Sequence, residues 1–282
     1  LEYKEKLFLT AATKKRIKGA GGQVNNKPMY VDKYLFDEFD NSFPTGMLPA
    51  ILGVLNKHQF AYEIVDLRVP TYPSLTFGQP SGKYAFIKPR QYQNDAIDNS
   101  IYKKRGILRI ACGGGKTLCA GEVVKDLRRR AVFLVNRSGL LYQAKEVFEE
   151  MLGVPIGQVG DGVVDIQNIS VVMIQTLVKY LGKEYDPFDE EDMFEDTTDV
   201  QKYSKQIQDL LNGTEVLFLD ECHCIGAKTA YDCITSFKNA EWKIGLSATP
   251  VREDGKTIFF EACIGPRLAD ISFTFLIENE FL

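Results

Sequence analysis

The chain has 282 residues, of which 45% are apolar and 26% charged, as in an ordinary globular protein with one large or two smaller domains. It contains no apolar run of about 20 residues, so we expect no transmembrane helix. Six scattered cysteines predict a reducing compartment and no disulfide framework. The net charge of −4 hides a mildly basic body, because residues 184–199 hold nine acidic side chains and the chain without them would carry +5.

Residues 1–80 predict a small α+β accessory domain that contacts DNA. We expect strands at 6–10, 29–32 and 60–67 and a helix at 47–57. The basic residues at 14–18, beside glycines, predict either a mobile loop that meets phosphate or a solvated loop. Prolines, glycines and hydroxyl residues at 70–82 predict a linker to a second domain over residues 84–282.

The second domain begins with a helix over 88–102 that carries Arg90 and Gln93 near its start. The amide of Gln93 offers a donor and an acceptor that match the N6 and N7 edge of adenine, which would select ATP over GTP. A glutamine on a helix surface is the alternative. We therefore include Arg90 and Gln93 among the candidate nucleotide-binding residues.

A phosphate-binding loop follows the apolar strand expected at 106–111. It consists of Gly113, Gly114, Gly115, Lys116 and Thr117, and a helix-like stretch comes directly after it. Glycines allow backbone N–H groups to converge on phosphate oxygens, lysine reaches the outer phosphates, and the threonine hydroxyl ligates Mg²⁺. The general pattern has glycine where this chain has an isoleucine at position 110, and a plain glycine turn is the alternative.

Two carboxylates, Asp220 and Glu221, end the fully apolar strand expected at 216–219. Two adjacent charges there are costly without a cation. We expect Asp220 to hold Mg²⁺ and Glu221 to orient the attacking water or accept its proton, with His223 coupling this site to a neighbouring loop. Zinc is disfavoured, because the cysteines flanking His223 have no second Cys/His pair at finger-like spacing.

Further apolar strands are expected at 131–135, 156–159, 169–174 and 243–246, and candidate polar residues follow the first, third and fourth. Ligands of open α/β sheets bind at the carboxyl ends of such strands. A helix cap is the alternative for Ser138 and Thr176. Ser247 and Thr249 are placed to hydrogen-bond to the acidic strand end and couple it to a DNA-facing surface. The polar residues after the first and third of these strands are Asn136, Arg137, Ser138, Gln175 and Thr176.

Together these segments resemble the motifs of a superfamily 2 helicase in order and spacing over residues 84–282. Gln93 resembles the adenine-reading motif and residues 111–117 motif I. Residues 220–223 (Asp-Glu-Cys-His) resemble the DExH form of motif II. Residues 136–138, 175–176 and 247–249 resemble motifs Ia, Ib and III. Residues 252–254 and 264–267 are similar to the XPB-type branch, near which the phage UvsW-like helicases stand.

The resemblance implies an α/β fold: a P-loop RecA-like parallel sheet with helices on both faces, after the accessory domain. It implies ATP and Mg²⁺ as cofactors, and unwinding or branch migration of forked, branched or single-stranded DNA in the cytoplasm of a bacterial or phage-infected cell. Motifs Ia and Ib would hold DNA phosphates, with Arg252 as a further contact. We find no second RecA-like lobe, whose arginines supply ~10³–10⁵ in rate in comparable enzymes, and expect a fragment with little turnover.

Two other functions fit the same residues. One is a double-stranded DNA translocase of restriction-motor or remodeller type. The other is a non-catalytic DNA-binding module that uses the accessory domain. An RNA helicase is disfavoured by Arg252, Glu253 and Asp254.

Overall fold

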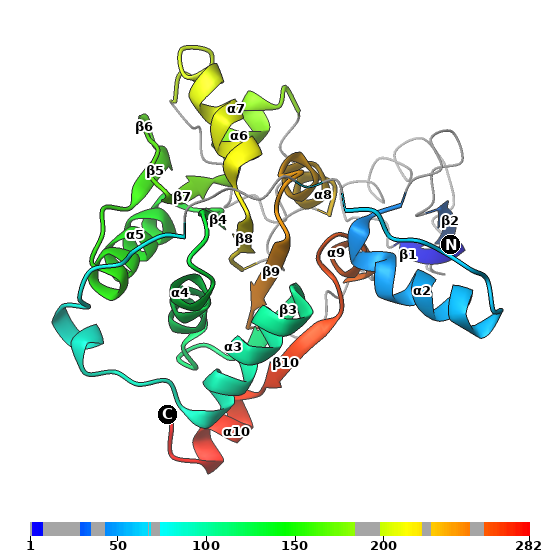
Figure 1. The fold of residues 1–282 in the computed structure, drawn as a ribbon, viewed down its shortest axis with the longest axis horizontal. Helices are drawn as coiled ribbons and strands as arrows, with labels where there is room; N and C mark the ends of the chain where they lie inside the picture. Colours follow the sequence, from blue (N-terminus) through cyan, green and yellow to red (C-terminus); the bar gives the residue numbers. More distant parts are fainter. Residues whose placement is uncertain are drawn as a thin grey trace, which may run out of the picture.

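A computed structural model describes residues 2–7, 29–34, 43–66, 68, 74–183, 198–221, 227–248 and 257–282 (Figure 1). The basic loop expected at 14–18 and the predicted site residues His223, Thr249 and Arg252 lie outside these ranges. Among the described residues, none of the helices combines the length and the hydropathy needed to cross a bilayer.

An eight-stranded sheet forms the centre of the molecule, in the order β10-β3-β9-β8-β4-β7-β5-β6. All neighbouring pairs are parallel except β5 with β6, which is antiparallel. The predicted parallel sheet is therefore confirmed. Its strands are β3 (Arg105–Ile110), β4 (Ala131–Val135), β5 (Gly157–Gly160), β6 (Val163–Asp165), β7 (Ile169–Met173), β8 (Val216–Leu219), β9 (Trp242–Ser247) and β10 (Arg267–Ile271).

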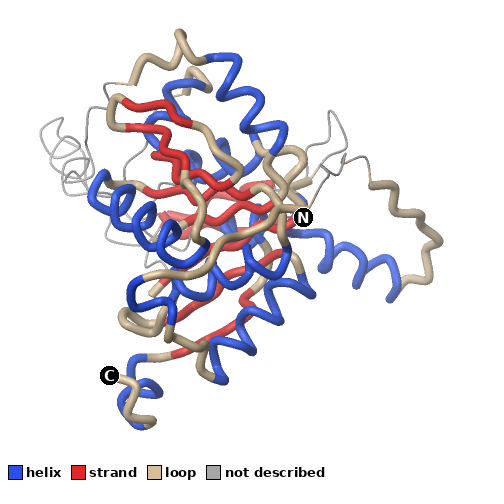
Figure 2. Tube along the Cα trace, turned by 60° about the vertical axis from the view of Figure 1, so that its left-hand side comes forward, coloured by secondary structure: helices blue, strands red, loops and turns tan. Residues whose placement is uncertain are grey.

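Helices cover both faces of this sheet, as Figure 2 shows. One face packs against α3 (Gln91–Lys103), α4 (Lys116–Leu127) and α5 (Ser138–Leu152). The other face packs against α6 (Ile174–Tyr180), α7 (Ser204–Gly213), α8 (Ala227–Ser236) and α9 (Thr257–Ile264). A parallel sheet buried on both faces explains why its central strands are continuous apolar runs.

Alternation along β4 shows how one strand supplies both cores. Phe133 points into the first face, where its ring lies 5.0 Å from that of Phe148 and 6.0 Å from that of Phe218. Val132 and Leu134 point into the second face. Successive residues of the strand therefore pack into opposite cores. This packing on both faces holds the carboxyl ends of the strands at one rigid edge.

The described part of the segment before the sheet differs from the prediction at one expected strand. Strands β1 (Glu2–Leu7) and β2 (Met29–Tyr34) form a separate antiparallel pair, and the short helix η1 (Thr45–Met47) leads into α2 (Leu48–Lys57). The strand expected at 60–67 is wrong for the described residues 60–66, which form no strand. Phe60 and Val65 are 63% and 67% exposed. These apolar residues pair with no strand in the described part of the chain, so an apolar run alone does not specify a strand here.

The described part of the predicted linker, residues 74–82, lies along the helices of the sheet (Figure 1). The N–H groups of Leu75, Gly78 and Ser81 donate to carbonyl oxygens of Arg128, Leu152 and Glu150, at 2.9, 2.9 and 2.8 Å. The helix η2 (Gly82–Ala85) then leads to α3. At the far end of the chain, β10 extends the sheet and α10 (Phe273–Glu278) packs beside the start of α3.

Close packing of η1 against α9 predicts the effect of one substitution. A Cβ on Gly46 would lie within 2.8 Å of the backbone of Ala262, which cannot move aside as a flexible side chain would. We expect Gly46→Ala to separate η1 from α9, seen as faster amide hydrogen exchange in both and a lower melting temperature.

The matched control is Gly53→Ala in α2, where an added Cβ would meet nothing within 4 Å. This change should leave exchange in α9 unaltered and stabilise α2 by up to ~1 kcal/mol. Equal behaviour of the two variants would contradict the packing described here.

Candidate active site

The glycine loop joins β3 to α4 and has the geometry of a phosphate-binding loop. Gly113 and Gly115 adopt φ of 80° and 87°, a region that favours glycine, and α4 begins at Lys116. The isoleucine at position 110 is fully buried, and a Cβ on Gly114 would lie 3.0 Å from the carbonyl oxygen of Ala111. Isoleucine in place of the usual glycine is therefore accommodated inside the core and does not open the loop.

The acidic pair lies beside this loop, although β8 and β3 are separated by β9 in the sheet. Nζ of Lys116 is 2.9 Å from Oε1 of Glu221, and the two side chains are 11% and 24% exposed. Asp220 directly follows β8, and its N–H donates to the carbonyl oxygen of Leu134 at 2.9 Å. The structure thus brings Lys116, Asp220 and Glu221 together at the carboxyl edge of the sheet.

Backbone strain is found at the same point. Glu221 has φ of 42°, and its N–H donates to Oδ1 of Asp220 at 3.0 Å. A side chain in this left-handed region costs on the order of 1 kcal/mol. The carboxylate of Asp220 thus helps to hold its neighbour in the conformation that faces Lys116.

Burial makes Asp220 an unusual carboxylate. The residue is 9% exposed, and desolvation together with the nearby charge of Glu221 raises its pKa from 3.8 to about 6, although Lys116 acts in the opposite direction. Such a group is stabilised when a cation replaces the lost water. The charged form of Asp220 is therefore costly in the protein alone and would be favoured by a bound cation.

These residues fit Mg²⁺ held jointly with a nucleotide. The described residues contain no group of three or more His, Cys, Asp or Glu side chains that could hold a metal alone. Mg²⁺ commonly takes one or two protein oxygens and completes its shell with water and substrate phosphates. Asp220 and the hydroxyl of Thr117, the second residue of α4, are the candidate protein ligands, and Lys116 and the three glycines are the candidate phosphate-binding groups.

Gln93 is buried against the phosphate-binding loop. Its Nε2 donates to the carbonyl oxygen of Gly114 at 2.9 Å, and its Oε1 accepts the N–H of Arg90 at 2.8 Å. Both halves of the amide are therefore used inside the protein, and the helix-surface alternative is excluded by its 5% exposure. Recognition of adenine by this amide would use its second N–H, which now faces the hydroxyl of Tyr92 at 3.3 Å, and the second lone pair of Oε1.

Tyr92 is a site residue that the sequence reading missed. Its hydroxyl donates to the carbonyl oxygen of Gly114 at 3.0 Å, and its ring packs against Phe275 and Phe281 of the C-terminal segment. The guanidinium of Arg90 lies 4.3 Å from the ring centre of Phe281. An aromatic residue next to Gln93 at a helix start was the available signal, but its aromatic partners are more than 180 residues away along the chain.

The residues expected to contact DNA separate into two groups. Arg137 is exposed and Ser138 half-buried at the start of α5. Asn136, Gln175 and Thr176 are 2%, 6% and 0% exposed, so their side chains cannot contact DNA directly in this structure. Nε2 of Gln175 donates to the carbonyl oxygen of Asn136 at 2.6 Å, which ties the ends of β4 and β7 together.

Ser247 ends β9 and is 3% exposed. Gly245 pairs with Leu219, so Ser247 lies level with the residues that follow β8. The coupling of Ser247 to the acidic pair stays a prediction. The other two residues expected to couple, His223 and Thr249, are outside the described ranges.

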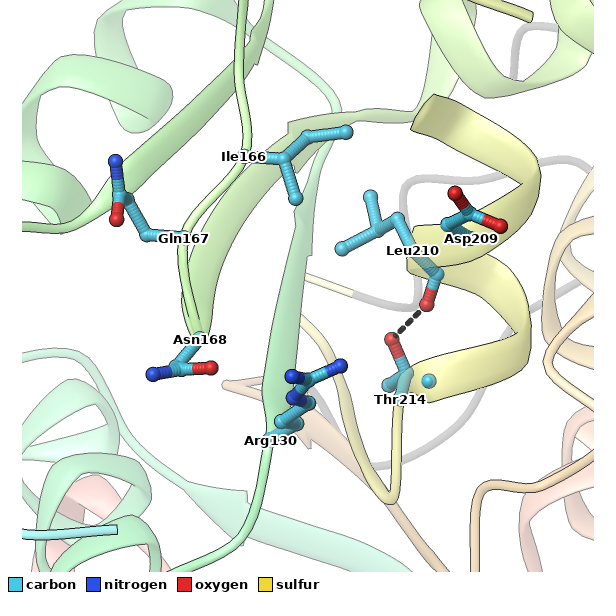
Figure 3. Close-up of a pocket in the computed structure, with 8 residues that line it drawn as sticks. Arg130, Ile166, Gln167, Asn168, Asp209, Leu210 and Thr214 are labelled. Carbon is cyan, nitrogen blue, oxygen red and sulfur yellow. Dashed lines mark hydrogen bonds between the residues drawn. The ribbon is translucent and has the colours of Figure 1, made fainter. Parts of the chain in front are cut away.

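A separate hollow of about 220 Å³ lies at the opposite edge of the sheet (Figure 3). Arg130, Asn168 and Thr214 line it, just before β4, β7 and β8 begin. Figure 3 shows the hydroxyl of Thr214 bonded to the carbonyl oxygen of Leu210, at 2.6 Å. Arg130, Asn168 and Asp209 are exposed there and Thr214 is buried, and none of the candidate catalytic residues lines the hollow.

Comparison with known proteins assigns the family. Residues 86–252 match the family described as Type III restriction enzyme, res subunit (ResIII). The chain belongs to this family. ResIII domains are superfamily 2 helicase domains, so the predicted superfamily is confirmed. The matched residues include the phosphate-binding loop, the acidic pair and Ser247.

Several relatives resemble this ResIII chain over part of their length. DNA 3'-5' translocase XPB2 of Sulfurisphaera tokodaii is 26% identical over 180 residues, which cover 64% of this chain and 35% of the relative. The helicase/translocase subunit XPB of general transcription and DNA repair factor IIH from Danio rerio is 25% identical over 198 residues, covering 68% and 24%. The chain thus spans about a third or less of these relatives.

The fold is also similar to that of a phage protein. The crystal structure of the UvsW helicase from bacteriophage T4 superimposes with a TM-score of 0.60 at 16% identity, covering 94% of this chain and 89% of that one. At this identity the similarity establishes the fold alone. It confirms the RecA-like α/β architecture of the ResIII domain.

The buried state of Asp220 predicts a gain of stability when its charge is removed. Its pKa is raised in the folded protein, so the folded state retains a proton that the unfolded state loses as pH rises from about 4 to about 6, and stability falls across that window. The shift from 3.8 to about 6 corresponds to about 3 kcal/mol at neutral pH.

We therefore expect Asp220→Asn to raise the free energy of unfolding at pH 7 by up to that amount and to abolish the fall between pH 4 and pH 6. Urea denaturation at several pH values measures both. Asp209→Asn, an exposed change in α7, is the control and should show neither effect. A loss of stability in Asp220→Asn at pH 7 would show that this carboxylate stabilises the fold.

Proposed function

We propose that this chain is the first motor lobe of an ATP-dependent DNA helicase or translocase that unwinds or branch-migrates forked and junction DNA. The observation that carries the proposal is the 2.9 Å contact between Lys116 of the phosphate-binding loop and Glu221 of the acidic pair. Phosphoryl transfer to water needs phosphate-binding groups and a water-orienting carboxylate within one site.

Each residue has a distinct part in this proposal. The glycine N–H groups and Lys116 bind the phosphates, and Thr117 and Asp220 hold Mg²⁺, which neutralises charge on the transferred group. Glu221 orients the attacking water or takes its proton. Because Glu221 occupies Lys116 in the protein alone, ATP binding must break this ion pair and so frees the carboxylate for that task.

The substrate is proposed from the relatives and from the motifs. XPB2 is named a DNA translocase and XPB a DNA repair helicase/translocase subunit. Arg137 and Ser138 are the described residues proposed to meet a DNA phosphate, largely without reading sequence, and Arg252 is proposed from the motif alone. Branched DNA is proposed as the substrate because residues 252–254 and 264–267 resemble the XPB and phage UvsW-like helicases. By the same resemblance, the protein is proposed to act in the cytoplasm of a bacterial or phage-infected cell.

A second RecA-like lobe is proposed to complete the motor in the whole protein. In the resembling helicases it supplies arginines that stabilise charge on the transferred phosphate. We therefore expect this chain to bind ATP with little turnover, since such an arginine contributes ~10³–10⁵ in rate.

A double-stranded DNA translocase is the second candidate. The description of the family as a restriction-enzyme subunit and the name of the XPB2 relative favour it. Strand displacement from forked and four-way DNA by the whole protein separates the two: released single strands support the helicase, whereas ATP-dependent movement without release supports the translocase.

Nucleotide binding by this chain is the direct test. We expect Lys116→Ala to weaken MgATP binding at least tenfold, measured by calorimetry, because the phosphates lose their buried cation. Lys125→Ala, on the same helix but paired with Glu122, is the control and should bind as the unmodified chain does. Equal affinity in the two variants would refute the proposed phosphate site.

A further inference from the structure

A cavity of about 440 Å³ lies where the N-terminal segment meets the sheet domain. It opens at the amino ends of β3 and β9, whereas the phosphate-binding loop and the acidic pair lie at the carboxyl edge. One wall is apolar and comes from Phe43, Pro44, Leu48, Ile64 and Val65.

The other wall is mainly cationic: Arg68, Arg105, Lys238 and Lys243 line it together with the carboxylate of Asp66. Arg105 and Lys243 are direct partners in the parallel register of β3 and β9, so two positive side chains stand next to each other. Lys243 is 5% exposed, and its Nζ donates to the carbonyl oxygen of Ile234 at 2.8 Å. Arg105 donates to Oγ1 of Thr45 at 2.6 Å and to the carbonyl oxygen of Ala240 at 3.2 Å. All of these partners are neutral.

The nearby acidic groups are already paired or neutral. Asp66 accepts Nε of Arg68 at 2.7 Å, and Glu241 pairs with Lys104. Burial raises the pKa of the Cys263 thiol to about 12, so it carries no charge at neutral pH. In the described part of the chain, therefore, no carboxylate forms an ion pair with Arg105 or Lys243.

This arrangement is costly for the protein alone. Burial, aided by the charges of Arg105 and Arg68, lowers the pKa of Lys243 to about 7, and burial lowers that of Arg105 to about 10. Buried cations are ordinarily paired, and adjacent like charges on neighbouring strands repel. An anion in the cavity would remove both penalties.

We propose that this cavity binds a phosphate group attached to an apolar or aromatic body, as in a nucleotide. Guanidinium and ammonium groups together suit phosphate oxygens, and the volume lies within the ~300–1,000 Å³ typical of small-molecule sites. The apolar wall and the ring of Tyr231, which is 39% exposed, face the remainder of the ligand. The nucleotide comes either from solution or from the phosphorylated end of a DNA strand.

This cavity is separate from the proposed ATP site. Its test therefore uses a chain in which the ATP site is disabled by substitution. Adenosine 5'-monophosphate, adenosine and inorganic phosphate are titrated by calorimetry into the Lys116→Ala chain. We expect the monophosphate to bind with one-to-one stoichiometry and adenosine at least tenfold more weakly. Because turnover is not measured, a failure of the ATPase proposal would leave this result intact.

Two variants in the same background locate the binding. Lys243→Met keeps the side-chain length and removes the charge, and should weaken monophosphate binding at least tenfold. Lys238→Met, on the exposed rim of the cavity, should weaken it about threefold without endangering the fold. The control is Lys179→Met, whose Nζ donates to the carbonyl oxygen of Thr198 elsewhere, and it should have no effect.

A short DNA strand with and without a 5'-phosphate distinguishes the sources. Tighter binding of the phosphorylated strand than of the monophosphate indicates a DNA end, and the reverse order indicates a free nucleotide; either supports the proposal. The proposal is overturned if no phosphate-bearing probe binds, if Lys243→Met and Lys238→Met bind as Lys179→Met does, or if only a carboxylate-bearing acidic peptide binds.

Discussion

The contact between Lys116 and Glu221 depends on the whole sheet. The lysine follows β3 and the carboxylate follows β8, two strands that are about 110 residues apart in the chain and are separated in the sheet by β9. Only a parallel arrangement brings the carboxyl ends of all three to one edge. The apolar layers on both faces hold that edge rigid, so the charged groups meet with their water largely removed.

The two ends of the strands carry crowded charges of opposite sign. At the carboxyl edge Asp220 is buried next to a second carboxylate, Glu221, and at the amino edge the half-buried Arg105 and the buried Lys243 are adjacent cations. Each edge therefore favours a ligand of the opposite sign. Oγ1 of Thr45 accepts a hydrogen bond from Arg105 at the amino edge, so a ligand there would touch both the N-terminal segment and the sheet domain.

Local patterns predicted the parts of this molecule that depend on local chemistry. Glycines before Lys116 specify a turn that few other residues adopt, and apolar runs such as β4 and β8 specify buried strands. The strand expected at 60–67 is absent from the described residues 60–66, because a run of apolar residues does not specify the neighbouring strand with which it must pair. The role of Tyr92 and the pairing of Arg105 with Lys243 depend on which distant elements become neighbours, which spacing along the chain does not reveal.

The affinity of a Glu221→Gln chain for MgATP tests the central claim most directly. If Lys116 and Glu221 share one phosphate site, neutralising the carboxylate frees the lysine and removes repulsion of the phosphates. Binding should then tighten about fivefold, the equivalent of about 1 kcal/mol for a partly buried ion pair. Unchanged or weaker binding would contradict a single site in which the phosphate-binding loop and the acidic pair act together.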